Sequence, residues 1–259
     1  FSFLHLAPAP ELKARLCEIG LTAVAFETVV DHGGLPVLAP MSNIAGRIAV
    51  QAGTHYLHRP LGGKGVMLGG LGSVARGNVV ILGAGNVGAN AAQVAAGLGA
   101  QVTVFDKNPL KLVKMHEWAP NITAMYPYQD ALDRAIREAD LLIGAVLLPG
   151  AKAPVLVNRE QVAGMEDGSV IVDVAVDQGG CIETTRPTTY VDPVYVEQGV
   201  VHFGVTNMPG AVPRTASAAL SASLLPYVQR LATGNWQDDR ALAQGINVRG
   251  GEVVLPALL

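Results

Sequence analysis

The sequence predicts an α/β fold built on a parallel sheet, and two observations support this. Half of the 259 residues are hydrophobic and 15% are charged, a balance that suits strands buried on both faces of a sheet. Short apolar segments also alternate with helical ones, which is typical of parallel strands joined by right-handed crossovers. The strands are predicted at 79–82, 102–105, 141–146, 170–174 and 200–205, and the helices at 86–98, 109–116, 130–138 and 159–164.

A glycine-rich turn predicts that this sheet binds a dinucleotide. The first strand runs into a G-x-G-x-x-G sequence, made of Gly83, Ala84, Gly85, Asn86, Val87 and Gly88. Its glycines permit a tight turn, a close approach of backbone to a pyrophosphate, and close packing of helix on sheet, while N–H groups at the helix start would bind the phosphates. Asp106, at the end of the next strand, would accept hydrogen bonds from a ribose 2′-OH and repel a 2′-phosphate, which favours NAD. The alternative is a turn without ligand and an Asp106 that caps its strand.

The two ends of the chain are predicted to form part of a second, discontinuous α/β domain. Residues 1–6 are expected to form a strand, 11–19 a helix and 23–26 a strand, and Ser42 is expected to cap a long helix. Another helix is expected from 213 to about 232. The predicted domains are a partial substrate domain at 1–38, a Rossmann NAD-binding domain at 39–210, and a helical return to the substrate domain at 211–259.

Composition argues against several other classes of protein. A net charge of −3 offers no basic surface for nucleic acid or an anionic membrane. The apolar runs are shorter than the ~20 residues of a membrane-spanning helix, and no signal peptide or metal-binding spacing is present. Cys17 and Cys181 suit reduced thiols in a cytoplasmic protein, although a single disulfide also fits the sequence.

Three segments after predicted strands are expected to line the cofactor cleft, since ligands of such sheets bind beyond the carboxyl ends of the strands. They are 145–150, 173–180 and 205–210. Asp177 is the sharpest candidate for acid–base work, the alternative being an aspartate that stabilises its own turn. His5 is a second candidate, since an imidazole suits proton exchange near neutral pH. A lone histidine in an apolar strand is nevertheless more often a core residue.

Longer segments resemble L-alanine dehydrogenase over nearly the whole chain. They are 3–7, 26–29, 40–42, 45–47, 62–65, 149–154, 173–180 and 207–215, which include Pro-Met-Ser, Gly-Gly-Lys-Gly, Asp-Val-Ala-Val-Asp-Gln-Gly-Gly and Asn-Met-Pro-Gly-Ala-Val-Pro-Arg-Thr. The resemblance implies reversible oxidative deamination of L-alanine to pyruvate and ammonia with NAD, His5 and Asp177 being the catalytic residues. It implies cofactor contacts at Ser42, the turn from Gly83 to Gly88, Asp106, Lys111, Val146, Leu147, Val174, Ala175, Val176, Asp177, Arg186, Val205, Thr206, Asn207 and Met208. It also implies a homo-oligomer, often a hexamer; the segment 215–232 would suit an interface or a core equally well.

The resemblance also predicts an incomplete chain and leaves two alternatives. The family has a further N-terminal segment with a substrate-binding arginine and lysine, for which Lys13 and Arg15 are no replacement, so weak or absent turnover is expected of these residues alone. The first alternative is the NAD(H)-binding component of a proton-translocating transhydrogenase, which usually has Gln-Asn-Gly-Gly where this chain has Asp-Gln-Gly-Gly at 177–180. The second is an inert NAD-binding fragment.

Overall fold

A computed structural model describes residues 1–146 and 153–259 of the chain. The described residues form two compact units. The terminal unit comprises 1–42 and 212–259, and the central unit comprises 43–146 and 153–211.

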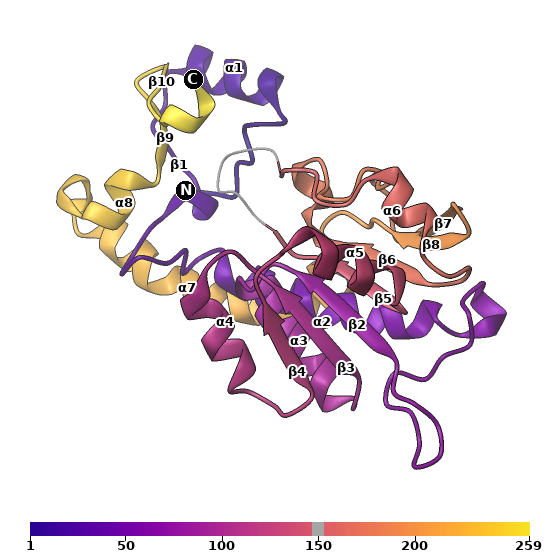
Figure 1. Ribbon diagram of the computed structural model, residues 1–259. Helices are drawn as coiled ribbons and strands as arrows, with labels where there is room; N and C mark the ends of the chain where they lie inside the picture. The colour runs from indigo at the N-terminus through magenta and orange to yellow at the C-terminus, as the bar shows by residue number, and fades with distance from the viewer. Residues whose placement is uncertain (147–152) are drawn as a thin grey trace. The chain divides into compact units, whose positions relative to one another are not determined.

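The central unit is built on a seven-stranded sheet with the order β4-β3-β2-β5-β6-β8-β7 (Figure 1). The strands are β2 (Asn78–Leu82), β3 (Gln101–Phe105), β4 (Ile122–Met125), β5 (Leu141–Gly144), β6 (Val170–Asp173), β7 (Val194–Glu197) and β8 (Val200–Phe203). All neighbours pair in parallel except β7 and β8, which are antiparallel. The chain starts in the middle, winds outward to β4 and returns to the other side at β5. This doubly wound order confirms the predicted Rossmann-type sheet.

Helices cover both faces of this sheet because successive strand residues point to opposite sides. The helices of the unit are α2 (Ala39–Tyr56, which begins in the terminal unit), α3 (Asn86–Gly97), α4 (Pro109–His116), α5 (Gln129–Arg137) and α6 (Arg159–Ala163). Val80, Leu142 and Ile171 pack in one buried cluster with residues of α5 and α6. On the other face, α2 packs so closely that a Cβ on Gly53 would lie 2.4 Å from the Leu141 side chain. Burial on both faces explains why these strands are apolar throughout.

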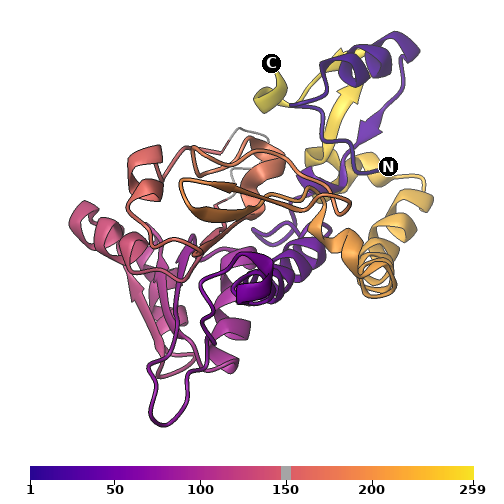
Figure 2. The same cartoon turned by 90° about the vertical axis from the view of Figure 1, so that its right-hand side faces the viewer.

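The terminal unit has a smaller sheet of antiparallel strands in the order β1-β9-β10. Its elements are α1 (Pro10–Ile19), β1 (Ala23–Val24), α7 (Pro213–Ala232), α8 (Arg240–Gln244), β9 (Ile246–Arg249) and β10 (Glu252–Val253). The helix α1 lies beside the turn between β9 and β10, where a Cβ on Gly251 would be 2.9 Å from the Cys17 carbonyl oxygen (Figure 2). The predicted helical return at 211–259 therefore also contains two strands, β9 and β10, after α8. Short 3-10 helices complete the chain at η1 (Phe26–Thr28), η2 (Arg59–Leu61), η3 (Val174–Gln178), η4 (Met208–Ala211), η5 (Trp236–Asp238) and η6 (Pro256–Leu258).

Two local predictions are wrong. Residues 1–6 do not form a strand: Ser2 makes a single β-bridge to Ala25, and His5 has a φ of 47°, which interrupts extended backbone. Ser42 does not cap its helix, because α2 already begins at Ala39 and the Ser42 N–H donates to the Leu38 carbonyl. Pro40 is accommodated in the first helical turn, where a missing N–H costs nothing.

Among the residues that the structure describes, no helix is both long and apolar enough to cross a membrane. The same residues contain no cluster of three or more histidine, cysteine or acidic side chains that could hold a metal ion. Cys17 and Cys181 are both free thiols.

Candidate functional site

The glycine turn after β2 is shaped by contacts that only glycine permits. Gly83 has a φ of 104°, and a Cβ there would lie 2.7 Å from the Ala145 carbonyl oxygen at the end of β5. A Cβ on Gly88 would lie 1.8 Å from the Gly83 carbonyl oxygen, so α3 packs directly on the turn. By contrast, a Cβ on Gly85 would meet no described atom within 4 Å. The turn is thus closed on its inner side and open above Gly85, which leaves room for a ligand.

The start of α3 suits an anion. Its N-cap is Gly85, which provides no side-chain oxygen for the first N–H groups of the helix. These N–H groups carry the positive end of the helix dipole and have no intrahelical acceptors. The helices α4, α6 and α8 have an Asn or Asp at the N-cap that accepts from first-turn N–H groups, whereas α1, α5 and α7, like α3, have no side-chain cap. An uncapped helix start beneath an open glycine turn is the arrangement that binds a pyrophosphate.

Asp106 connects the glycine turn to the end of β3. Its Oδ2 accepts a hydrogen bond from the Ala84 N–H at 2.7 Å, and its Oδ1 accepts one from the Asn108 N–H at 2.8 Å. The Lys111 ammonium lies 4.0 Å from Oδ2. Each carboxylate oxygen has a second lone pair, so Asp106 retains the capacity to accept from a ribose hydroxyl. The structure therefore brings together the turn, the acid and the lysine that the sequence singled out.

Asp173 fixes the loop that follows β6. Its side chain is fully buried, with Oδ1 accepting from the Ala175 N–H at 3.0 Å. Oδ2 accepts from the N–H groups of Cys181 at 2.9 Å and Ile182 at 3.2 Å. Burial raises the pKa of the Asp173 carboxyl, and the hydrogen bonds from the backbone oppose that increase. These bonds close residues 173–182 into a ring.

Asp177 lies on this ring, in the 3-10 helix η3, and its side chain is exposed. The helix ends at Gly179, whose φ of 91° turns the chain back towards Cys181. Burial, followed by the nearby Asp173 charge, raises the pKa of the Cys181 thiol well above its usual value. Cys181 is therefore a neutral packing residue, and Asp177 is the exposed ionisable group of the ring.

The third predicted segment follows β8. Val205 and Met208 are buried, whereas Thr206 and Asn207 are exposed, and Asn207 has a φ of 52°. The Tyr190 hydroxyl donates to the Met208 carbonyl at 2.6 Å, which holds the segment from the side. The exposed backbone between two buried residues is thus presented at the carboxyl edge of the sheet.

Of the remaining predicted residues, only some lie near the glycine turn. Val146 packs beside it, its side chain 3.2 Å from a Cβ built on Gly83. Leu147 lies outside the described residues. His5 and Ser42 belong to the terminal unit. The His5 N–H donates to Glu27 Oε1 at 2.6 Å, and the His5 ring stacks on Phe3 with centroids 5.5 Å apart.

Two kinds of residue in the central unit were not predicted to contribute to the site. Asp173 begins the predicted segment 173–180, but its closure of the Asp177 loop could not be read from the sequence. Tyr195 and His202, on β7 and β8, were not among the predicted site residues, although they lie at equal distances from Gln198-Gly199. A glycine-containing pair between two apolar segments is a hairpin signal, and it would have placed these two rings opposite each other.

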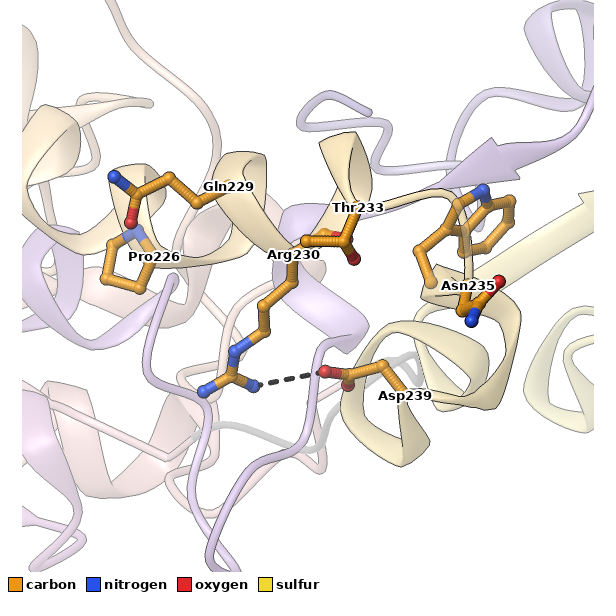
Figure 3. Close-up of a pocket in the computed structure, with 7 residues that line it drawn as sticks. Pro226, Gln229, Arg230, Thr233, Asn235 and Asp239 are labelled. Carbon is orange, nitrogen blue, oxygen red and sulfur yellow. Dashed lines mark hydrogen bonds and ion pairs between the residues drawn. The ribbon is translucent and has the colours of Figure 1, made fainter.

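A cavity of about 450 Å³ in the terminal unit contains none of the predicted site residues (Figure 3). It lies between the end of α7 and η5. Its cation, Arg230, is paired with Asp31 at 3.1 Å and with Asp239 at 3.5 Å. Because these charges already satisfy one another, the cavity offers no evident ligand site.

The fold and the glycine–acid arrangement define a Rossmann-type nucleotide-binding protein. Residues 49–256 match the family described as alanine dehydrogenase/PNT, C-terminal domain. Alanine dehydrogenases from Halomonas elongata and Bacillus subtilis are 48% and 47% identical to this chain, covering all of it and 71% and 70% of their own lengths. The chain belongs to the alanine dehydrogenase family, and thus to the amino-acid oxidoreductases.

Solved structures agree with this assignment. A structure of L-alanine dehydrogenase has a TM-score of 0.91 and 52% sequence identity, covering 99% of this chain and 72% of its own. The structure of a transhydrogenase from Sinorhizobium meliloti has a TM-score of 0.80 and 27% identity, covering 98% of this chain and 72% of its own. The fold is therefore shared with both groups, and the higher identity is to the dehydrogenase.

Proposed function

We propose that this protein catalyses the NAD-dependent, reversible oxidative deamination of L-alanine to pyruvate and ammonia. The observation that carries the proposal is the exposed Asp177 carboxylate on a ring closed by Asp173, in the same unit as the glycine turn and Asp106. Membership of the alanine dehydrogenase family supports the choice of substrate.

The residues around the turn fit a dinucleotide. The uncapped start of α3 would hold the pyrophosphate, and Asp106 would accept from the ribose of the adenosine half. Two buried oxygens near the second and third segments, Gln178 Oε1 and Thr185 Oγ1, have no partner within the described residues. Such oxygens are usually satisfied by a ligand or water. When bound, the nicotinamide supplies the acceptor for the hydride that leaves the alanine Cα.

The protein must then manage the protons of the reaction. Oxidation of alanine gives an imine, to which water adds before ammonia leaves, so protons must be taken from the amine and the water and returned to the leaving nitrogen. We assign these transfers to the Asp177 carboxylate and the His5 imidazole. His5 would also donate a hydrogen bond to the oxygen that becomes the pyruvate carbonyl. The reverse reaction uses the same groups in the opposite order.

The substrate carboxylate requires a cation, and two cations of α1 are already engaged. Arg15 pairs with Glu18 at 2.8 Å, and Lys13 donates to the Leu258 carbonyl at 3.1 Å. The relatives are longer than this chain, which spans 71% of the Halomonas elongata protein. The assay should therefore include a chimera that supplies the part of the relative to which this chain has no counterpart.

The test measures NADH formation from L-alanine and NAD, with NADH binding followed by fluorescence in parallel. Alanine-dependent turnover by the chain or the chimera, lost on Asp177→Asn with NADH binding retained, is the expected result. Binding without turnover in either protein would contradict the dehydrogenase proposal and favour a nucleotide-binding component like that of the transhydrogenase. Absence of NADH binding would contradict both.

We also propose that the protein forms a homo-oligomer, with a hexamer expected from the family. Of the 20 residues in α7, only Tyr227 is buried within this chain, which leaves an extended helix surface for a second copy. Light scattering after size-exclusion chromatography tests this. A monomer at micromolar concentration would contradict it.

A further inference from the structure

Arg186 is supported by two stacked rings at the antiparallel edge of the central sheet. Its guanidinium carbon lies 4.2 Å from the centroid of the Tyr195 ring. The Tyr195 ring also stacks on the His202 imidazole, with the two ring centroids 5.0 Å apart and an angle of 16° between the ring planes. Tyr195 and His202 are directly opposed residues of β7 and β8. A cation, a phenol ring and an imidazole therefore contact one another in series.

The His202 imidazole, at the buried end of this series, is fixed in place. His202 is fully buried, and burial lowers the pKa of its imidazole, so the ring is neutral. Its Nδ1 lies 2.9 Å from the Val200 carbonyl, which only accepts, so Nδ1 carries the hydrogen. Nε2 then accepts from the Thr184 hydroxyl at 2.7 Å. Both ring nitrogens are thereby satisfied, and the imidazole has one orientation.

Tyr195 connects the buried His202 imidazole to the backbone of Arg186. Its hydroxyl donates to the Thr184 carbonyl at 2.8 Å and accepts from the Arg186 N–H at 2.8 Å. The same side chain thus holds the Arg186 backbone with its hydroxyl and the Arg186 guanidinium with its ring. Burial raises the pKa of the Tyr195 phenol, so the hydroxyl keeps the proton that it donates.

An exposed arginine without such support would have many rotamers to lose on binding an anion. A guanidinium stacked on an aromatic face keeps its planar N–H edge available while its rotamers are restricted in advance. We propose that Tyr195, oriented by His202, is a positioning residue that holds Arg186 ready for the bound dinucleotide. This inference rests on the function proposed above and on the NAD contact that the resemblance to L-alanine dehydrogenase implies for Arg186.

The test is a fluorescence titration with NADH on the full chain and four variants. Arg186→Ala should raise the Kd for NADH about tenfold, the usual effect of losing a charged hydrogen bond. Tyr195→Leu, which removes the aromatic face, should raise it about threefold to fivefold. Tyr195→Phe keeps that face and should rescue most of the loss. The double variant R186A/Y195L should bind no more weakly than Arg186→Ala alone, because Tyr195 acts through Arg186.

The matched control is Tyr227→Leu, which removes the contact of Arg230 over Tyr227 in the terminal unit and should leave the Kd for NADH unchanged. Circular dichroism checks that each variant is folded. Should Tyr195→Leu fail to fold, Arg186→Lys carries the same test, since an ammonium keeps the charge but loses the planar stacking and should weaken binding about threefold.

Two outcomes would overturn the positioning role while leaving the proposed function intact. They are unchanged NADH binding in Tyr195→Leu or Arg186→Lys, and additive losses in the double variant. Equal losses in Tyr195→Leu and Tyr195→Phe would overturn the role of the aromatic face and assign the positioning to the hydroxyl that holds the Arg186 backbone. Failure of the unmodified chain to bind NADH would overturn the proposed function, and the positioning role with it.

Discussion

The two proposed acid–base residues lie in different units, yet a carboxylate holds the backbone at each of them. Asp173 accepts hydrogen bonds from N–H groups at both ends of the ring that carries Asp177. Glu27 accepts from the N–H groups of Leu4 and His5, at 3.3 Å and 2.6 Å. In both places a carboxylate satisfies backbone donors that no regular element satisfies.

The two carboxylates differ in burial and in the length of backbone that each one holds. Asp173 is fully buried and joins positions eight and nine residues away in the sequence, whereas Glu27 is half-buried and contacts two adjacent residues. The first arrangement fixes a whole loop, and the second fixes one bend, at which His5 takes a left-handed φ of 47°. A buried anchor therefore ties the Asp177 loop to the sheet core, while the bend at His5 depends on one half-buried carboxylate that is 22 residues away in the sequence.

The largest expected effect compares the two acid–base residues directly. Asp177→Asn should lower alanine-dependent turnover about 1000-fold and His5→Gln about 100-fold, because each removes a proton-transfer group. Both variants should still bind NADH. The control is Asp167→Asn, an exposed aspartate that precedes β6 instead of following it, and its turnover should be unchanged. Wild-type turnover in Asp177→Asn would refute its assignment.

The second prediction compares the two anchors by urea unfolding. Asp173→Asn should lower the free energy of unfolding by about 3 kcal/mol, since an amide NH₂ would face buried backbone donors, and Glu27→Gln by about 1 kcal/mol. The tryptophans are Trp118, in the central unit, and Trp236, in the terminal unit. Single-tryptophan backgrounds therefore report each unit separately. Equal losses for the two variants would show that burial does not distinguish the anchors.

The third prediction concerns pH and the terminal unit. Burial, then the hydrogen bond to Asp31 and its charge, raise the pKa of Tyr227 to about 12 from 10.0. Because the folded state holds this proton more tightly, the stabilisation is complete below pH 10 and is lost as the pH rises towards 12. Unfolding reported by Trp236 should lose about 2 kcal/mol across that interval. Tyr227→Phe should abolish this loss, and a persisting loss would assign it to another group.

The smallest expected effect is on the discrimination between NADH and NADPH, and it concerns the central unit alone. Asp106→Asn removes the charge expected to repel a 2′-phosphate but keeps an oxygen to accept from the backbone. The ratio of the Kd values for NADPH and NADH should fall about tenfold. Asp130→Asn, an exposed aspartate on α5, serves as the control. An unchanged ratio would remove Asp106 from coenzyme discrimination.

The sequence predicted the central unit better than the terminal unit for a physical reason. Strands such as β2 and β5 are buried on both faces, so their apolar character is visible without knowing their neighbours. The edge strands β4 and β7 were missed because they are partly exposed, whereas the equally short β5, β6 and β8 are buried throughout. The two-residue strand β1 was recognised only roughly, and the strand at 1–6 was wrong because Glu27, distant in sequence, stabilises the bend at His5.

The candidate site was predictable where a motif is contiguous. The turn at 83–88 and Asp106 are brought together as expected, because the motif itself specifies strand, turn and helix. The support beneath Arg186 was not foreseen, because it depends on the register of Tyr195 against His202 across an antiparallel pair. Side chains that hold a functional group from below leave no contiguous pattern, and they emerge only when the pairing of strands is known.

The hairpin of β7 and β8 also has a consequence for the order of folding. Its two-residue turn places Gln198 and Gly199 at φ values of 54° and 76°, which is the type I′ geometry that matches the twist of antiparallel strands. Tyr195 and His202 meet across this short loop, whereas the bond from Ala84 to Asp106 spans 22 residues and a helical crossover. The entropic cost of loop closure is smaller for the hairpin than for the crossover, and such hairpins form in about 1–10 μs. The stacked rings of Tyr195 and His202, which support Arg186, can therefore form before the parallel strands that complete the nucleotide site have paired.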